Sequence, residues 1–256
     1  MESFFNLIGL GALAGVLPVY LGIAVALFTK RMMARTWEGF LIGVANGVLV
    51  YLFFDLMHES VELTGSRDLL SWSVFLGCLF VSFVGLVALE QHQMRDNRSS
   101  SEPRHRLSLP YMIALGMGLH NLGEGLAIGA SYANGEAVLS GLLVAGFALH
   151  NGTEGFGIVG AAGRTEVPWR DIVLLGVVAG APTCLGTLLS GQELSPYFTL
   201  ACFTLAAGSL LYVIFALTVV SYTATRRLQA ALGTFLGISL MFITAMLLTL
   251  LTGITS

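Results

Sequence analysis

The motif LHNLGEGLAIG, from Leu119 to Gly129, returns thirty residues later as LHNGTEGFGIVG, from Leu149 to Gly160. Both copies lie within long apolar stretches, and both place histidine, asparagine and glutamate in the same order. A charged side chain at the centre of a bilayer costs about 2.5–3.5 kcal/mol on insertion scales, and such residues almost always have a partner. The repeated polar triplet therefore indicates a shared task inside a membrane.

The composition also indicates a membrane protein. Of the 256 residues, 55% are hydrophobic and 11% are charged, and the mean hydropathy is +0.83. A soluble domain carries roughly 25% charged residues. Cys78, Cys184 and Cys202 all lie in apolar stretches, which is typical of small buried hydrophobes rather than of a disulfide set. Because the N-terminal stretch lacks a basic region, we expect no cleaved signal peptide.

Eight apolar stretches are long enough to cross a bilayer, which takes about 20 residues per helix. We therefore predict an all-α integral membrane protein with one polytopic domain over residues 1–256. The predicted helices are Phe4–Phe28, Gly39–His58, Leu69–Leu89, Leu109–Ala133, Val138–Ala162, Ile172–Ser190, Tyr197–Tyr222 and Leu228–Leu251. Their connections are short except for the polar loop Gln91–Ser108.

The basic residues predict the orientation of these helices. Eleven of the twelve follow odd-numbered helices: Lys30, Arg31, Arg35, Arg95, Arg98, Arg104, Arg106, Arg164, Arg170, Arg226 and Arg227. Arg67 alone lies on the other side. Because Lys and Arg accumulate in cytoplasmic loops, we expect the loop 91–108 to be cytoplasmic and both termini to be extracytoplasmic. The expected location is the cell (inner) membrane, as a multi-pass protein.

Two further pairs of stretches resemble each other. GVLVYLFFDL (Gly47–Leu56) resembles GSLLYVIFAL (Gly208–Leu217), and AGVLPVYLG (Ala14–Gly22) resembles AGAPTCLG (Ala179–Gly186). An odd number of crossings separates the copies, so they point in opposite directions. We predict a 3+2+3 inverted repeat, which is typical of transporters with a substrate site near the midplane. The proline in each copy of the second pair should kink or break its helix.

The spacing within the motif predicts a metal site. Residues four apart share one face of a helix, as His120 and Glu124 do. Two such motifs on antiparallel helices offer two imidazoles, two carboxylates and two amide oxygens around one point, a set that suits Zn²⁺ and its first-row neighbours. Asp55 is a further acid inside a predicted helix. The candidate metal ligands are Asp55, His120, Asn121, Glu124, His150, Asn151 and Glu154.

Other interpretations of these residues stay open. A single buried histidine or asparagine most often joins neighbouring helices by hydrogen bonds, so a protein without transport activity is one alternative. An intramembrane zinc-dependent hydrolase, which would use the same ligands to activate water, is another. Against it, the HExxH motif is absent and no spare carboxylate beside the ligands stands out as a general base.

The sequence resembles the ZIP (Zrt-/Irt-like) family of divalent metal transporters over nearly its whole length. HNLGEG, HNGTEG, FFDLMHE (Phe53–Glu59) and GAPTCLGTLLSG (Gly180–Gly191) carry the resemblance. It implies that His120, Glu124, His150 and Glu154 form the main metal site, with Asp55 as a further ligand. It also places Asn121 and Asn151 at a second metal position.

The resemblance further implies a function and its partners. The expected function is import of Zn²⁺ into the cytoplasm, with Cd²⁺, Mn²⁺ and Fe²⁺ as further candidate substrates, and no enzymatic activity. The first, fourth, fifth and sixth helices would carry the ion past the other four in an elevator-like motion. The expected partners are the ion, the lipid bilayer and a second copy in a homodimer, and no nucleic acid.

The sequence departs from the family pattern in three places. The loop 91–108 holds only His92 and His105, where many members have a histidine-rich tract. The sixth predicted helix has no carboxylate to complete a second metal position. His58 and Glu59 stand where the family usually has Pro and Glu.

Overall fold

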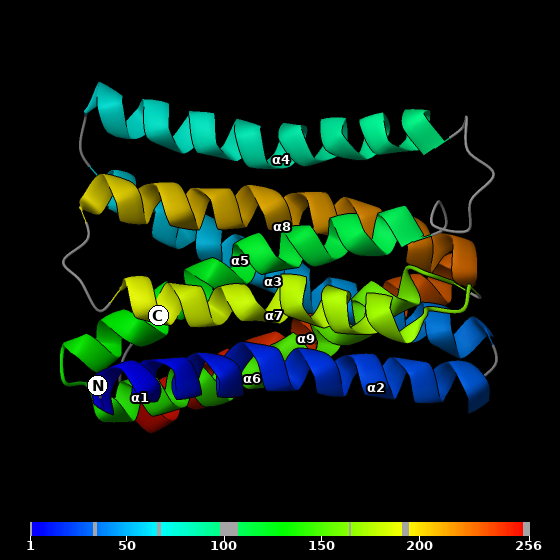
Figure 1. Cartoon of the computed structure of the whole chain (residues 1–256), viewed down its shortest axis with the longest axis horizontal. Coiled ribbons are helices and arrows are strands. Elements are labelled where there is room, and N and C mark those ends of the chain that lie inside the picture. Colours follow the sequence, from blue (N-terminus) through cyan, green and yellow to red (C-terminus); the bar gives the residue numbers. More distant parts are fainter. Residues whose placement is uncertain are drawn as a thin grey trace.

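The computed structural model describes residues 2–32, 35–65, 68–97, 107–163, 165–190 and 195–252 as eight helical rods, with no strand among these residues. The first rod is continuous through α1, η1 and α2. The helices are α1 Glu2–Gly11, η1 Ala12–Val16 (a π-helix), α2 Leu17–Met32, α3 Arg35–Thr64, α4 Leu69–Asn97, α5 Ser108–Ala133, α6 Ala137–Gly160, α7 Trp169–Leu189, α8 Pro196–Ala224 and α9 Arg227–Thr252. The rods lie roughly side by side, and α1 begins at the end of the bundle where α9 finishes (Figure 1).

Six of the rods are long and apolar enough to cross a membrane: those made by α1–α2, α3, α4, α7, α8 and α9. The other two, α5 and α6, carry the repeated motif, and its polar residues lower their hydropathy. Their 26 and 24 residues give lengths of about 36–39 Å at ~1.5 Å per residue, enough for a hydrocarbon core of about 30 Å. The fold is therefore that of an all-α membrane protein.

Several predicted boundaries need correction. The helix α4 continues to Asn97, so the predicted loop at 91–108 begins too early. The helix α3 likewise runs past its predicted end to Thr64. The prediction followed the apolar stretch alone, whereas Glu, Gln and Arg sustain a helix outside a bilayer as well.

The two prolines expected to kink or break their helices have different surroundings. Pro18 follows the π-helical turn η1, in which the Leu17 N–H bonds to the Ala12 carbonyl. The helix α7, by contrast, continues through Pro182. Neither proline breaks its helix, because packing on neighbouring helices supports the backbone on both sides.

The rods pack in two groups. The motif group consists of α1, η1, α2, α5, α6 and α7, with its strongest packing between α5 and α7 and between α2 and α6. The flanking group consists of α3, α4, α8 and α9, in which α3 packs on α8 and α9, and α4 packs on α8 at one edge of the bundle (Figure 1). The groups meet where α5 contacts α8 and where α6 contacts α3.

Candidate metal centre

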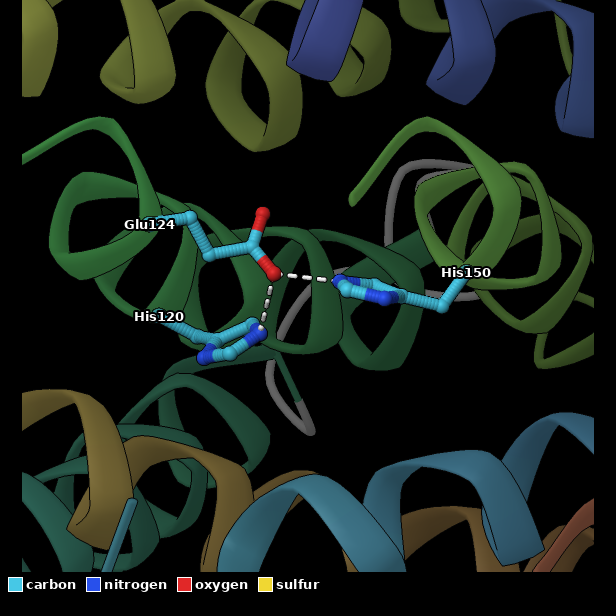
Figure 2. A group of neighbouring side chains, drawn as sticks. All are labelled: His120, Glu124 and His150. Atoms are coloured by element: carbon cyan, nitrogen blue, oxygen red, sulfur yellow. Dashed lines mark hydrogen bonds and ion pairs between the residues drawn. The ribbon is translucent and has the colours of Figure 1, made fainter. Parts of the chain in front are cut away.

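The two motifs face each other from neighbouring helices. A short turn, in which Gly135 has a positive φ of 78°, joins α5 to α6. Glycine adopts this conformation without strain, so the two helices can run antiparallel in contact. The turn thus brings His120 and Glu124 on α5 opposite His150 on α6 (Figure 2).

One oxygen of Glu124 lies between two imidazoles. The Nε2 atom of His120 is 3.2 Å from Glu124 Oε1, and His150 Nε2 contacts the same oxygen (Figure 2). Among the described residues, His120, Glu124 and His150 form the group whose ligand atoms all lie within 4.8 Å of one another. All three side chains are buried, so an ion bound there would be shielded from solvent.

Glu154 lies at the edge of this group. Its Oε1 atom is 3.7 Å from His120 Nε2, and the residue is fully buried. The structure therefore places both histidines and both glutamates of the two motifs around one buried point. Such a set of imidazole and carboxylate groups can hold Zn²⁺ or a related divalent ion.

The asparagines cross between the motifs. Asn121 donates from Nδ2 to Glu154 Oε2 at 3.0 Å, and Asn151 donates from Nδ2 to Glu124 Oε2 at 2.9 Å. Each asparagine thus holds the glutamate of the opposite motif. Spacing along one helix could not show this, because the bonds join two helices.

Several buried acceptors in the cluster lack a hydrogen-bond partner in the described part of the chain. They are Asn121 Oδ1, Asn151 Oδ1 and Glu154 Oε1. Buried polar atoms are normally paired, and an orphan needs an explanation such as an ion. Three unpaired oxygens beside two imidazoles suit a cation, which these atoms would ligate directly.

Asp55 lies outside this buried group. It lines a cavity of about 240 Å³ between α3, α6 and α9, and His150 lines the same cavity. Most other lining residues are apolar, among them Leu142, Phe147 and Met241. Asp55 therefore faces a space that reaches the cluster but does not join the residues gathered there.

No protein-family profile matches the chain. A protein of Arabidopsis thaliana named "Putative zinc transporter At3g08650" is 26% identical over 238 residues, which cover 84% of this chain and 37% of that protein. The zinc transporter ZIPB of Bordetella bronchiseptica is 27% identical over 214 residues, covering 80% of this chain and 69% of the relative.

Over about four fifths of its length the chain is similar to two proteins named as zinc transporters, as the resemblance of its motifs to the ZIP family predicts. The match spans little more than a third of the Arabidopsis relative and about two thirds of the Bordetella protein. Both of these relatives are named as transporters and not as enzymes.

Two backbone groups beside the cluster were not predicted from the sequence. The backbone carbonyls of Ala14 and Ala179 accept the second amide hydrogen of Asn151 and of Asn121, at 2.9 and 3.0 Å. The sequence holds a signal for the first: Pro18 stands four residues after Ala14, so the α-helical donor for that carbonyl is missing.

Proposed function

We propose that the protein transports divalent metal ions, foremost Zn²⁺, across the membrane into the cytoplasm. The buried pairing of two HNxxEG motifs carries the proposal. It supplies two imidazoles, two carboxylates and unpaired amide oxygens in one place inside the bundle. The named zinc transporters among its relatives favour transport over intramembrane hydrolysis.

The proposed site contains His120, Glu124, His150 and Glu154, with Asn121 and Asn151 supplying amide oxygens. Asp55 would meet the ion in the cavity that reaches His150. A carboxylate there attracts cations, and the apolar walls around it keep its field poorly screened. Cd²⁺, Mn²⁺ and Fe²⁺ fit the same donor set and are further candidate substrates.

The proposed mechanism is an elevator-like movement of the motif group past the flanking group. The site belongs wholly to the motif group, except for Asp55 on α3. The proposal includes a 3+2+3 inverted repeat with both termini outside the cytoplasm. This orientation is supported by the basic residues, because eleven of twelve follow odd-numbered predicted helices.

The test is uptake of radioactive Zn²⁺ into proteoliposomes by the wild type, Glu124→Gln and Glu154→Gln. Glutamine keeps the shape and removes the charge, so both variants should lose uptake while eluting as folded protein. Glu136→Gln is the matched control, since Glu136 is an exposed acid in the turn between α5 and α6. Uptake by both site variants at the wild-type rate would refute the proposal.

A further inference from the structure

Each motif asparagine divides its amide hydrogens between a glutamate and a backbone carbonyl. Asn151 bonds to Glu124 of α5 and to the Ala14 carbonyl of η1. Asn121 bonds to Glu154 of α6 and to the Ala179 carbonyl of α7. Each amide therefore links a glutamate, through two hydrogen bonds, to the backbone of a helical rod that contains a proline.

The first carbonyl needs this bond. In an α-helix, the Ala14 carbonyl would accept from the N–H of residue 18, and Pro18 has none. Ala14 is fully buried, where an unpaired carbonyl is costly. Asn151, also fully buried, supplies a donor at 2.9 Å. It holds the Ala14 carbonyl of the π-helical turn, whose α-helical donor Pro18 removes.

The hydrogen bonds of Asn121 follow the same pattern, but the carbonyl that they reach lies one residue closer to its proline. Pro182 removes the α-helical donor of the Val178 carbonyl, and Gly118 closes on that carbonyl so tightly that an added methyl group would lie 2.3 Å from it. Asn121 binds the next carbonyl, Ala179. Both asparagines thus act within one turn of a proline.

The two proline-containing segments also touch each other, at a contact we name the proline crossing. A methyl group on Gly15 would lie 2.1 Å from Thr183 Oγ1, and one on Gly180 would lie 2.8 Å from Val16 Cα. Such close backbone packing leaves little freedom, so a shift on one side is felt on the other. The crossing joins the first rod to α7 beside the cluster.

We propose that Asn121 and Asn151, besides offering their amide oxygens to the ion, use their amide hydrogens to couple metal binding at the two glutamates to the proline crossing. An ion bound by Glu124 and Glu154 fixes their carboxylates, and the asparagine amides that donate to these carboxylates are fixed in turn. The second amide hydrogen of Asn121 then holds the Ala179 carbonyl, and that of Asn151 holds the Ala14 carbonyl. This inference rests on the proposed function, since it requires an ion at the glutamates.

Each asparagine acts through its own two hydrogen bonds, so the two asparagine variants are matched controls for each other. Zn²⁺ alone, added to the purified full-length protein, should slow amide hydrogen exchange roughly fivefold around residues 11–19 and 178–186, the scale of one hydrogen bond. Asn151→Ala should abolish the effect at 11–19 and keep it at 178–186. Asn121→Ala should do the reverse. Zn²⁺ binding is measured on the same samples by calorimetry.

If an alanine variant does not purify as folded protein, the leucine variant replaces it, because leucine has a similar size and lacks the amide donors without adding a charge. Exchange is compared at Zn²⁺ concentrations that saturate each variant. Equal loss of protection at both segments in either variant, or no loss in both, would overturn the coupling while leaving metal binding intact. No Zn²⁺ binding by the wild type would overturn the proposed function and this inference together.

Discussion

Glycine serves two different kinds of contact in this bundle. Inside the groups it lets backbones touch: a methyl group on Gly22 of α2 would lie 1.9 Å from the Gly152 carbonyl of α6. At the boundary between the groups it meets side chains instead. A methyl group on Gly157 of α6 would lie 3.2 Å from Leu217 Cδ1 of α8. Backbones cannot yield, whereas side chains change rotamer, so the boundary is the interface suited to movement.

The same contrast recurs on other helices. Inside the flanking group, a methyl group on Gly47 of α3 would lie 2.0 Å from the Thr234 carbonyl of α9. Across the boundary, Gly160 of α6 meets the side chain of Ile42 on α3. Each group thus contains close backbone contacts of the kind that small residues allow between helices in membranes, although Gly39 and Gly176 meet side chains inside their groups. This contrast indicates which helices would move together in the proposed mechanism.

Locking the boundary should have the largest effect. A Cβ on Gly123 of α5 would lie 3.4 Å from Ala206 Cβ of α8, close to the spacing of a disulfide, about 3.5–4.5 Å. In a background without the native cysteines, the pair Gly123→Cys/Ala206→Cys should lose Zn²⁺ uptake when oxidised and regain it when reduced.

The control for this crosslink joins two helices of one group. Gly39→Cys/Ala224→Cys connects α3 to α8, where the two Cβ atoms would lie 3.0 Å apart. A Cβ on Gly39 would also lie 2.8 Å from Thr225 Cβ, so the oxidised form is compared with the reduced form of the same variant. Its oxidation should leave uptake intact. Full transport by the oxidised boundary pair would show that the groups do not move past each other.

Alanine substitutions at two glycines of α5 test whether the two kinds of contact differ in their effect on the stability of the protein. A methyl group on Gly125 would lie 2.1 Å from the Thr183 carbonyl inside the motif group. Gly125→Ala should therefore destabilise the protein by about 1–3 kcal/mol or more. Gly123→Ala faces the boundary with an ordinary contact and should be neutral, or stabilise by up to about 1 kcal/mol. Thermal unfolding in detergent compares them, and equal losses would remove the distinction.

Substitution of Asp55 tests what the flanking group contributes to the affinity for the ion. Asp55→Asn removes a negative charge from the cavity wall, so the KM of uptake should rise several-fold for every divalent ion, a change on the order of 1 kcal/mol. The maximum rate should not change. Competition among Zn²⁺, Cd²⁺ and Mn²⁺ provides the check, because a changed ion ranking would place Asp55 among the direct ligands.

Removal of a hydrogen-bonded carboxylate at the edge of the flanking group should have the smallest effect. Asp68, before α4, accepts hydrogen bonds from the Leu70 N–H and the Tyr197 hydroxyl of α8, which hold the pKa of its carboxyl below the ordinary value. A lowered pKa stabilises the fold above the unfolded value of about 3.9, and the contribution is lost as pH falls through the folded value. Asp68→Asn should lower the unfolding temperature slightly at pH 7 and converge with the wild type in acid. A pH-independent difference would contradict this.

The sequence was sufficient to predict the helical class and the meeting of the motifs. Adjacent helices joined by a short turn must run antiparallel, which sets His120 and Glu124 opposite His150. The sequence was not sufficient to predict which way the two asparagine amides point. Rotation of the side chain exchanges the amide oxygen and nitrogen, and only the neighbouring backbone carbonyls fix the orientation. The position of Asp55 outside the cluster depends on how α3 packs against α6, which no local pattern encodes.

X-ray absorption at the zinc edge identifies the ligands of the bound ion and so tests whether the two motifs hold it. Purified protein loaded with Zn²⁺ should bind it through nitrogen and oxygen ligands at about 2.0–2.2 Å, with imidazole among them. Replacing both His120 and His150 by alanine should remove the imidazole signal. Sulfur ligands at about 2.3 Å, or an unchanged imidazole signal in that double variant, would contradict a site built from the two HNxxEG motifs.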